Sequence, residues 1–188
     1  MPKDARYYLN HYRPQIEEAI RKSYSECIEY GYIEPISRSP CMIAGKIASL
    51  IIPEALDVDA NMLFHTHPLY SCGNDTLTHD FQRYITEHFS VFFSSTDIRL
   101  LFQHRILVGL VAGYTLDHKV VIRNANRVSS IIANNYAYRQ HEIINLISKY
   151  AAGLIPENDP LLQQTTVSFQ HYIDRYTPII EIMDLNLP

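Results

Sequence analysis

Two histidines separated by one residue, His65 and His67, are the side chains in this sequence best placed to bind a metal ion. They follow Asn61-Met-Leu-Phe64 and precede Pro68, a pattern that predicts a buried strand ending at a loop. Side chains alternate in direction along a strand, so residues two apart project to the same side. The two imidazoles are therefore expected to share one ion. An imidazole pair with one carboxylate is a zinc ligand set that leaves a fourth position for water, as in catalytic sites.

The segment Ser94-Ser-Thr-Asp97 supplies an acidic residue at the start of a predicted helix. Its composition is typical of a helix N-terminus, and Ile98, Leu101 and Phe102 form an apolar face behind it. The pattern S-x-x-D is common, so alone it indicates only a helix start. Its position after the strand and the H-x-H-P motif makes it a candidate part of the same site.

In this order the motifs resemble those of the JAMM (JAB/MPN) metalloprotease family, which has an upstream Glu, then H-x-H-P, then S-x-x-D. The resemblance covers residues 13–123, is strongest over residues 63–114, and is closest to bacterial JAB-type domains. It implies that His65, His67 and Asp97 are the ligands of one zinc ion, with the reacting water as the fourth ligand.

The resemblance also implies catalytic roles for Glu29 and Ser94. Glu29 would be the general base that takes a proton from the water and returns it to the leaving amine, because Glu-Tyr-Gly-Tyr-Ile is similar to the E-x-G strand start of several bacterial JAB-type domains. Glu26 is the alternative base if the strand begins earlier, and Glu34 also lies near this passage. Ser94 would donate a hydrogen bond to the oxyanion of the tetrahedral intermediate.

The chain departs from the family pattern between the two motifs. Phe93, rather than the frequent Pro, precedes Ser94, and 26 residues separate His67 from Ser94, a longer gap than is usual in the family. The insertion at about residues 69–93 is a candidate lid over the cleft.

The insertion also leaves a second choice of acidic ligand. Asp75 and Asp80 lie within it, and if either binds the metal, residues 94–97 only cap a helix. We favour Asp97 because the helix and strand that follow it match the order of elements in the family.

The elements around these motifs predict an α+β fold, a mixed β-sheet flanked by helices, of JAMM type. Three- and four-residue apolar steps predict helices, and runs of β-branched and aromatic residues predict strands. Helices are expected at 13–28, around 81–89, after Ser94, and at 126–152. Strands are expected at 29–36, 43–52, 61–64, 107–114 and 119–123. The last segment, 161–188, is expected to hold one helix and a tail.

The predicted organisation is a JAMM-like core over residues 1–125, with the insertion at about 69–93, and a helical C-terminal extension over residues 126–188 packed on it. A chain of 188 residues can bury roughly 70% of the surface that it exposes when unfolded. It therefore needs no metal merely to fold, and a bound metal is expected to serve chemistry.

Composition argues against two classes of partner. The 16 Lys and Arg residues against 20 Asp and Glu give a formal charge of −4, and the basic residues are scattered rather than gathered in a stripe that nucleic acid or an anionic membrane would require. No apolar run approaches the ~20 residues of a membrane span, and the N-terminus lacks a secretory signal. We expect a cytoplasmic protein, or one delivered into a host cytoplasm.

The cysteines Cys27, Cys41 and Cys72 are widely spaced and odd in number. This pattern does not predict a disulfide framework and indicates a reducing compartment. Cys72, although near the candidate site, is interpreted as a small buried residue rather than a metal ligand.

The function implied by the resemblance is a zinc metallopeptidase that hydrolyses an amide or isopeptide bond in a protein or peptide substrate, such as a ubiquitin or ubiquitin-like conjugate. The alternative is a catalytically inactive MPN-like scaffold that binds a protein partner through its C-terminal helices. The presence together of Glu29, His65, His67, Ser94 and Asp97 favours the enzyme, because a scaffold has no physical need for them.

Overall fold

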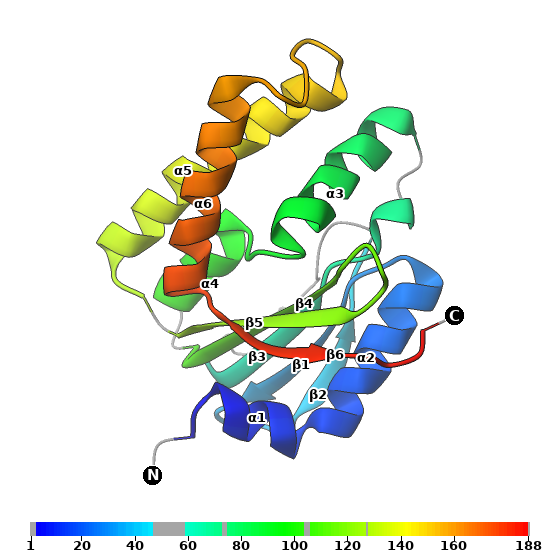
Figure 1. Ribbon diagram of the computed structural model, residues 1–188. Coiled ribbons are helices and arrows are strands. Elements are labelled where there is room, and N and C mark those ends of the chain that lie inside the picture. Colours follow the sequence, from blue (N-terminus) through cyan, green and yellow to red (C-terminus); the bar gives the residue numbers. More distant parts are fainter. Residues whose placement is uncertain (1–2, 47–58, 73–74, 104–105, 127, 188) are drawn as a thin grey trace.

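The computed structural model describes residues 3–46, 59–72, 75–103, 106–126 and 128–187. Within them six strands form one mixed sheet with helices on both faces, which confirms the predicted α+β class (Figure 1). The strands are β1 Tyr30–Pro35, β2 Cys41–Ala44, β3 Ala60–Thr66, β4 Val108–Tyr114, β5 Val120–Asn126 and β6 Ile179–Met183. The helices are α1 Ala5–His11, α2 Arg13–Glu26, α3 Thr76–Phe89, α4 Ser95–Gln103, α5 Ser130–Ala151 and α6 Pro160–Tyr176, with a short 3-10 turn, η1, at Tyr70–Cys72.

The strand order is β2-β1-β3-β4-β5-β6, and β3 and β4 are the one parallel pair among these neighbours. Parallel strands cannot be joined by a tight hairpin and need a crossover connection. Here the crossover contains η1, α3 and α4. It therefore places the start of α4 over one face of the sheet, next to β3 and β4.

Each face of the sheet packs against its own hydrophobic core. Helices α1 and α2 cover one face, and α3, α4, α5 and α6 cover the other (Figure 1). Alternation along β3 assigns its residues to the two cores, since Met62 and Phe64 pack toward α1 and α2 whereas Leu63 packs toward the other helices. By the same alternation, His65 belongs to the face covered by α3 to α6.

Side-chain caps fix where the longer helices begin. Asp75 accepts a hydrogen bond from the Thr78 amide at the start of α3, and Asp159 accepts bonds from two amides in the first turn of α6. Ser129 does the same for the Ile132 amide at the start of α5. Such caps satisfy backbone donors that a helix N-terminus leaves without partners.

The insertion contains the helix that was expected around residues 81–89, and this helix begins earlier, at Thr76. Most of residues 69–93 form α3, whose Tyr84 and Phe89 are buried in the core shared with α5 and α6. Tyr84 also shares a hydrogen bond of 2.9 Å with Thr166 on α6. The expected lid is therefore, in the described residues, a packed element that links the crossover to the C-terminal helices.

The C-terminal segment differs from the expected helix and tail. Its tail forms the edge strand β6, which pairs antiparallel with β5, so the extension contributes to the sheet as well as packing on it. The sequence gives no clear strand pattern for β6, because most of its side chains are partly or fully exposed at the sheet edge. The helix α1 was also not predicted. Of the strand expected over 43–52, residues 47–52 lie outside the described residues.

The interpretation of the cysteines is wrong. Cys27 and Cys72 form a disulfide, with Cα atoms 5.5 Å apart and 45 residues between them in sequence number, and Cys41 is free. Cys72 is thus neither a buried thiol nor a metal ligand. Spacing along the chain carried no information on this pair, because η1 and the end of α2 meet only in the folded state. The argument from cysteines for a reducing compartment loses its basis.

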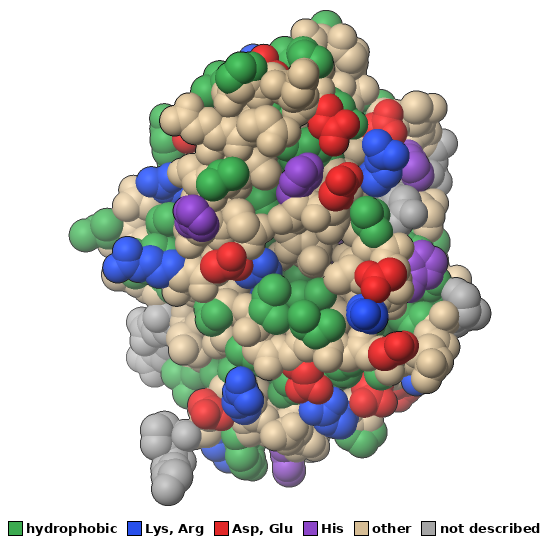
Figure 2. All heavy atoms as spheres, viewed as in Figure 1, with side chains coloured by type: hydrophobic (Ala, Val, Ile, Leu, Met, Phe, Trp, Pro, Cys, Tyr) green, Lys and Arg blue, Asp and Glu red, His purple; other side chains and the backbone are tan. Residues whose placement is uncertain are grey.

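The surface carries charges of both signs. On the face shown in Figure 2, basic and acidic side chains are interspersed and no large patch of one sign is seen. In the part of the chain that the structure describes, no helix has the length and apolar character needed to cross a bilayer.

Candidate metal centre

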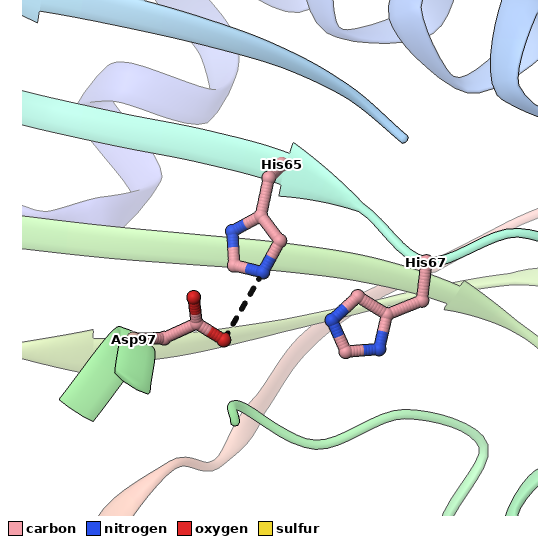
Figure 3. Close-up of side chains that lie close together, drawn as sticks. All are labelled: His65, His67 and Asp97. Atoms are coloured by element: carbon pink, nitrogen blue, oxygen red, sulfur yellow. Dashed lines mark ion pairs between the residues drawn. The ribbon is translucent and has the colours of Figure 1, made fainter. Parts of the chain in front are cut away.

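The structure brings His65, His67 and Asp97 together on one face of the sheet (Figure 3). One ligand atom from each residue can be chosen so that all three lie within 4.8 Å of one another. His65 is buried, and His67 and Asp97 are partly buried. The two histidines come from the end of β3 and the loop after it, and Asp97 comes from the first turn of α4. The structure thus brings Asp97 close to two histidines that precede it by 32 and 30 positions in sequence.

Strand register sets the neighbours of His65 on this face of the sheet. His65 is opposite Gly31 on β1 and Val111 on β4. Gly31 has no side chain, so the position beside His65 on the β1 side is free of a Cβ. The backbone amide of His67 still donates to the carbonyl of Ala112 at 2.8 Å, which continues the β3–β4 pairing by one residue. The imidazole of His67 is therefore held near that of His65, with ring centroids 5.2 Å apart.

Reciprocal hydrogen bonds between Ser94 and Asp97 fix the carboxylate. The Asp97 amide donates to Ser94 Oγ at 3.1 Å, and the Ser94 amide donates to Asp97 Oδ2 at 2.6 Å. This is the geometry of a capping box at the start of α4. A carboxylate has about four lone-pair sites, so Asp97 can cap the helix and bind a metal at once. The Ser94 hydroxyl oxygen accepts the Asp97 amide in this pair.

The contact between His65 and Asp97 has the spacing of two ligands of one ion. His65 Nε2 lies 3.3 Å from Asp97 Oδ2 (Figure 3), yet this buried nitrogen makes no hydrogen bond of acceptable geometry. Two ligand atoms at about 2.0–2.1 Å from a tetrahedral zinc ion lie about 3.3 Å apart. The spacing and the unpartnered nitrogen are therefore compatible with a metal ion shared by these two residues.

Burial and neighbouring charges shift the pKa values of the two histidines in opposite directions. Burial and the adjacent His65 lower the pKa of His67 to about 4, so that His67 is neutral at physiological pH. Burial also acts to lower the pKa of His65, but the negative charges of Asp97 and Glu29 outweigh it and raise that pKa above its usual value. The pKa of Asp97 is lowered because His65, His67 and a hydrogen bond from Ser94 outweigh the effect of burial. A neutral imidazole and an ionised carboxylate are the forms that bind metals.

Glu29, the residue implied as general base, lies beside this cluster. Its carboxylate is close enough to raise the pKa of His65, and the residue is only 8% exposed. Its backbone pairs with that of residues 45 and 46 immediately before β1. Glu29 and Gly31 are two apart, and Gly31 is opposite His65, so alternation places Glu29 on the side of the sheet that carries the histidines.

The other two glutamates near this passage have different surroundings. Glu26 is exposed on α2 and accepts a hydrogen bond from the Tyr30 hydroxyl at 2.7 Å. Glu34 accepts from the Tyr12 hydroxyl at 3.0 Å, on the side of the sheet covered by α1. Neither is among the groups that shift the pKa of His65.

The alternative acidic ligands within the insertion lie elsewhere. Asp75 caps α3, where it accepts bonds from both the amide and the hydroxyl of Thr78, and Asp80 lies 3.6 Å from His79 in an exposed pair. Neither joins the histidines in the described residues. A second group of possible ligands, Glu87, His88 and Glu157, includes two exposed glutamates. Such exposed acidic groups are common in proteins without a metal.

Two residues that contact this site were not found from the sequence. Tyr136 and Gln140 on α5 both donate hydrogen bonds to the carbonyl of Phe93, at 2.7 and 3.0 Å. Both are buried, and both lie on the extension rather than in a motif. Their spacing of four residues indicates only a shared helix face, and their partner is a backbone atom, so no sequence pattern identifies the contact.

Comparison with known proteins adds no assignment. No family model matches the chain, and no curated protein and no solved structure matches it.

Proposed function

We propose that this chain is a zinc-dependent metallopeptidase of JAMM type that cleaves an amide or isopeptide bond. The observation that carries the proposal is the convergence of His65, His67 and Asp97, in which a buried imidazole nitrogen lacks a hydrogen-bond partner at the distance expected for two ligands of one ion. A zinc ion held by these residues would polarise the scissile carbonyl and lower the pKa of water, leaving a fourth position for reaction.

The remaining chemistry belongs to side chains of this chain. Glu29, buried beside His65, would take the proton of the attacking water and return it to the leaving amine, a role typically worth about 10²- to 10⁴-fold in rate. The Ser94 hydroxyl, whose position is fixed by the Asp97 amide, would donate its proton to the oxyanion. The low pKa of Asp97 and the neutral state of His67 keep both in the form that binds metal.

The substrate class follows from the family resemblance rather than from the site. The proposed substrate is a protein or peptide, with a ubiquitin or ubiquitin-like conjugate to lysine as the first class to assay. Water activation is encoded in the five site residues, whereas specificity is a property of the surfaces around them.

The test is a metal count combined with matched variants. Protein purified without chelators is expected to hold about one zinc per chain by mass spectrometry, and His67→Ala is expected to lose the zinc and all turnover of peptide and isopeptide substrates. Glu29→Gln should keep the zinc and lose turnover, because it changes the proton carrier and no ligand. Glu26→Gln and His141→Ala, both on exposed helix positions, are the controls and should behave as wild type.

Each result has a defined meaning. A Glu29→Gln protein with full activity would overturn the role of Glu29, and equal loss in Glu26→Gln would transfer that role to Glu26. A wild-type protein that takes up no zinc even after supplementation would overturn the metallopeptidase proposal. That last result would favour the inactive scaffold and would direct the search to a protein partner.

A further inference from the structure

The peptide unit that joins Phe93 to Ser94 is held by hydrogen bonds at both ends. Its carbonyl accepts bonds from the Tyr136 hydroxyl at 2.7 Å and from Gln140 Nε2 at 3.0 Å. Its amide, on Ser94, donates to Asp97 Oδ2 at 2.6 Å. A trans peptide directs its carbonyl and its amide to opposite sides. Helix α5 therefore holds one side of this peptide unit and the candidate metal ligand holds the other.

This arrangement connects α5 to the metal site through a continuous series of polar contacts. The series runs from Tyr136 and Gln140 through the peptide unit to Asp97, and from Asp97 Oδ2 to His65 Nε2 at 3.3 Å. Hydrogen bonds in series polarise one another, so donors on the carbonyl make the amide a stronger donor. Inside a protein such a series also fixes orientation, because each buried group would be costly to leave unpaired.

The side chains that begin the series have few ways to move. Tyr136 is 1% exposed and Gln140 is 5% exposed. Tyr136 packs edge-on against Phe169 of α6. The two residues are four apart on α5 and so lie on the same face of that helix. Two donors from one rigid helix thus converge on a single carbonyl oxygen.

We propose that Tyr136 and Gln140 are positioning residues for the metal site, which orient the Asp97 carboxylate and the Ser94 hydroxyl through the Phe93–Ser94 peptide unit. This inference rests on the proposed function and gives the C-terminal extension a part in it. Partners that orient ligands in this way typically contribute 10- to 100-fold to metal affinity or activity. Neither residue touches the reacting atoms.

The variants are Tyr136→Phe, Gln140→Met and the two combined. Each keeps the side-chain volume nearly constant and removes one donor to the Phe93 carbonyl. The matched control is Tyr172→Phe, which also removes a tyrosine hydroxyl bonded to a helix carbonyl, that of Ile132 at 3.3 Å, but does not contact the peptide unit before Ser94.

Two measurements distinguish positioning from a structural role. Zinc affinity, measured by competition with a chelator, is expected to fall 10- to 100-fold in the double variant, with a fall in kcat and little change in KM. In zinc-free protein, hydrogen exchange at the Ser94 amide is expected to accelerate at least tenfold, since its bond to Asp97 weakens. Tyr172→Phe is expected to change neither.

The outcomes separate this inference from the proposed function. Wild-type zinc affinity together with unchanged Ser94 exchange in the double variant would overturn the positioning role, even if its melting temperature falls. The same losses in Tyr172→Phe would mean that α5 acts only through general stability, which also overturns it. A wild-type chain without zinc would overturn the metallopeptidase proposal, and the exchange measurement would still decide whether α5 orients Asp97.

Discussion

The Asp97 carboxylate caps a helix and is also a candidate metal ligand. It accepts the Ser94 amide at 2.6 Å as part of a helix cap, and it faces His65 Nε2 at 3.3 Å. If the segment only capped α4, any acid or amide at this position would serve, and nothing would require His65 and His67 nearby. In the proposed metal site, the cap at Ser94 orients the Asp97 carboxylate before a metal binds.

Residue patterns predicted part of this site and could not predict the rest. The shared direction of His65 and His67 follows from strand alternation alone, and the cap at Ser94 follows from residue type. The choice between Asp97 and the acids of the insertion depended on resemblance, because local patterns do not report distances across a crossover. The hydrogen bonds from α5 to the Phe93 carbonyl could not be predicted from the sequence, because their acceptor is a backbone atom.

Replacing Ser94 separates its cap from its proposed catalytic role. Ser94→Ala is expected to cost about 1 kcal/mol of stability through loss of the cap. It is also expected to lower kcat by about 10²- to 10³-fold, because a preorganised donor to the oxyanion is lost. Ser94→Thr keeps a hydroxyl at the same position and should retain both properties. Chemical denaturation and steady-state kinetics measure the two effects.

The control for Ser94 is another serine cap of the same chain. Ser129 caps α5 by accepting from the Ile132 amide, so Ser129→Ala should lose comparable stability with no change in kcat. If Ser129→Ala and Ser94→Ala lower kcat equally, the effect is one of stability and Ser94 has no catalytic role.

Among the elements, the passage from α2 to β1 is fixed from two directions. Cys27 ends α2 in a left-handed conformation with φ of 57°, and its disulfide to Cys72 attaches this point to η1. Two residues later Glu29 begins the pairing that leads into β1. The disulfide thus connects the segment before the proposed base with the turn that follows His67.

Removing this disulfide tests its contribution to stability. The loop that it closes, set by a sequence separation of 45, corresponds to about 4 kcal/mol in the chain-entropy description. Cys27→Ser with Cys72→Ser, or treatment of the wild type with a reductant, is expected to lower the unfolding free energy by that order in urea titrations. Cys41→Ser, which changes the free cysteine, is the control and should have little effect. A double variant as stable as wild type would show that the bond does not form in solution.

Element prediction succeeded where one face of an element is buried and failed at the edges. Helices α2, α3 and α5 have apolar periods that match their buried faces, and the central strand β4 is an apolar run that is buried along its whole length. The edge strand β6 does not, because its sequence Ile-Ile-Glu-Ile-Met leaves most side chains partly or fully exposed. The disulfide was missed for a different reason, because the spacing of cysteines in the sequence does not show which of them are close in space.

At the scale of the whole molecule, the sheet separates two cores and the site lies in one of them. The core that includes α3 to α6 contains the face from which His65 projects, and Phe93 packs in it 6.1 Å from the His65 ring. The C-terminal helices therefore pack in the same core as the candidate metal site. The sequence does not reveal this packing, because α5 and α6 lie outside both motifs and come close to them only in the folded chain.

Arg123 of β5 donates hydrogen bonds to the ends of α3 and α6. It is 1% exposed, and one guanidinium nitrogen donates to Asp174 at 2.8 Å and to the Thr177 carbonyl at 3.0 Å, both at the end of α6. The other donates to the Phe89 carbonyl at 3.4 Å, at the end of α3. One buried side chain thus holds the insertion helix and the last helix against the sheet. Its contacts with α6 lie at the end of that helix, immediately before the chain continues into β6.

Replacing Arg123 should therefore loosen the whole α3-to-α6 layer. Arg123→Met keeps an apolar stem but removes the donors, leaving the Thr177 and Phe89 carbonyls without these partners, and we expect a loss of about 2–3 kcal/mol. Asp174 adds little to that cost, because its side chain is half exposed and is solvated when the arginine is removed. For a chain of this size the melting temperature should fall by roughly 5–10 °C. Arg139→Met, which removes an exposed contact between α5 and Ser168 of α6, should change it by less than about 2 °C. Equal shifts in the two variants would mean that Arg123 does not hold this layer to the sheet.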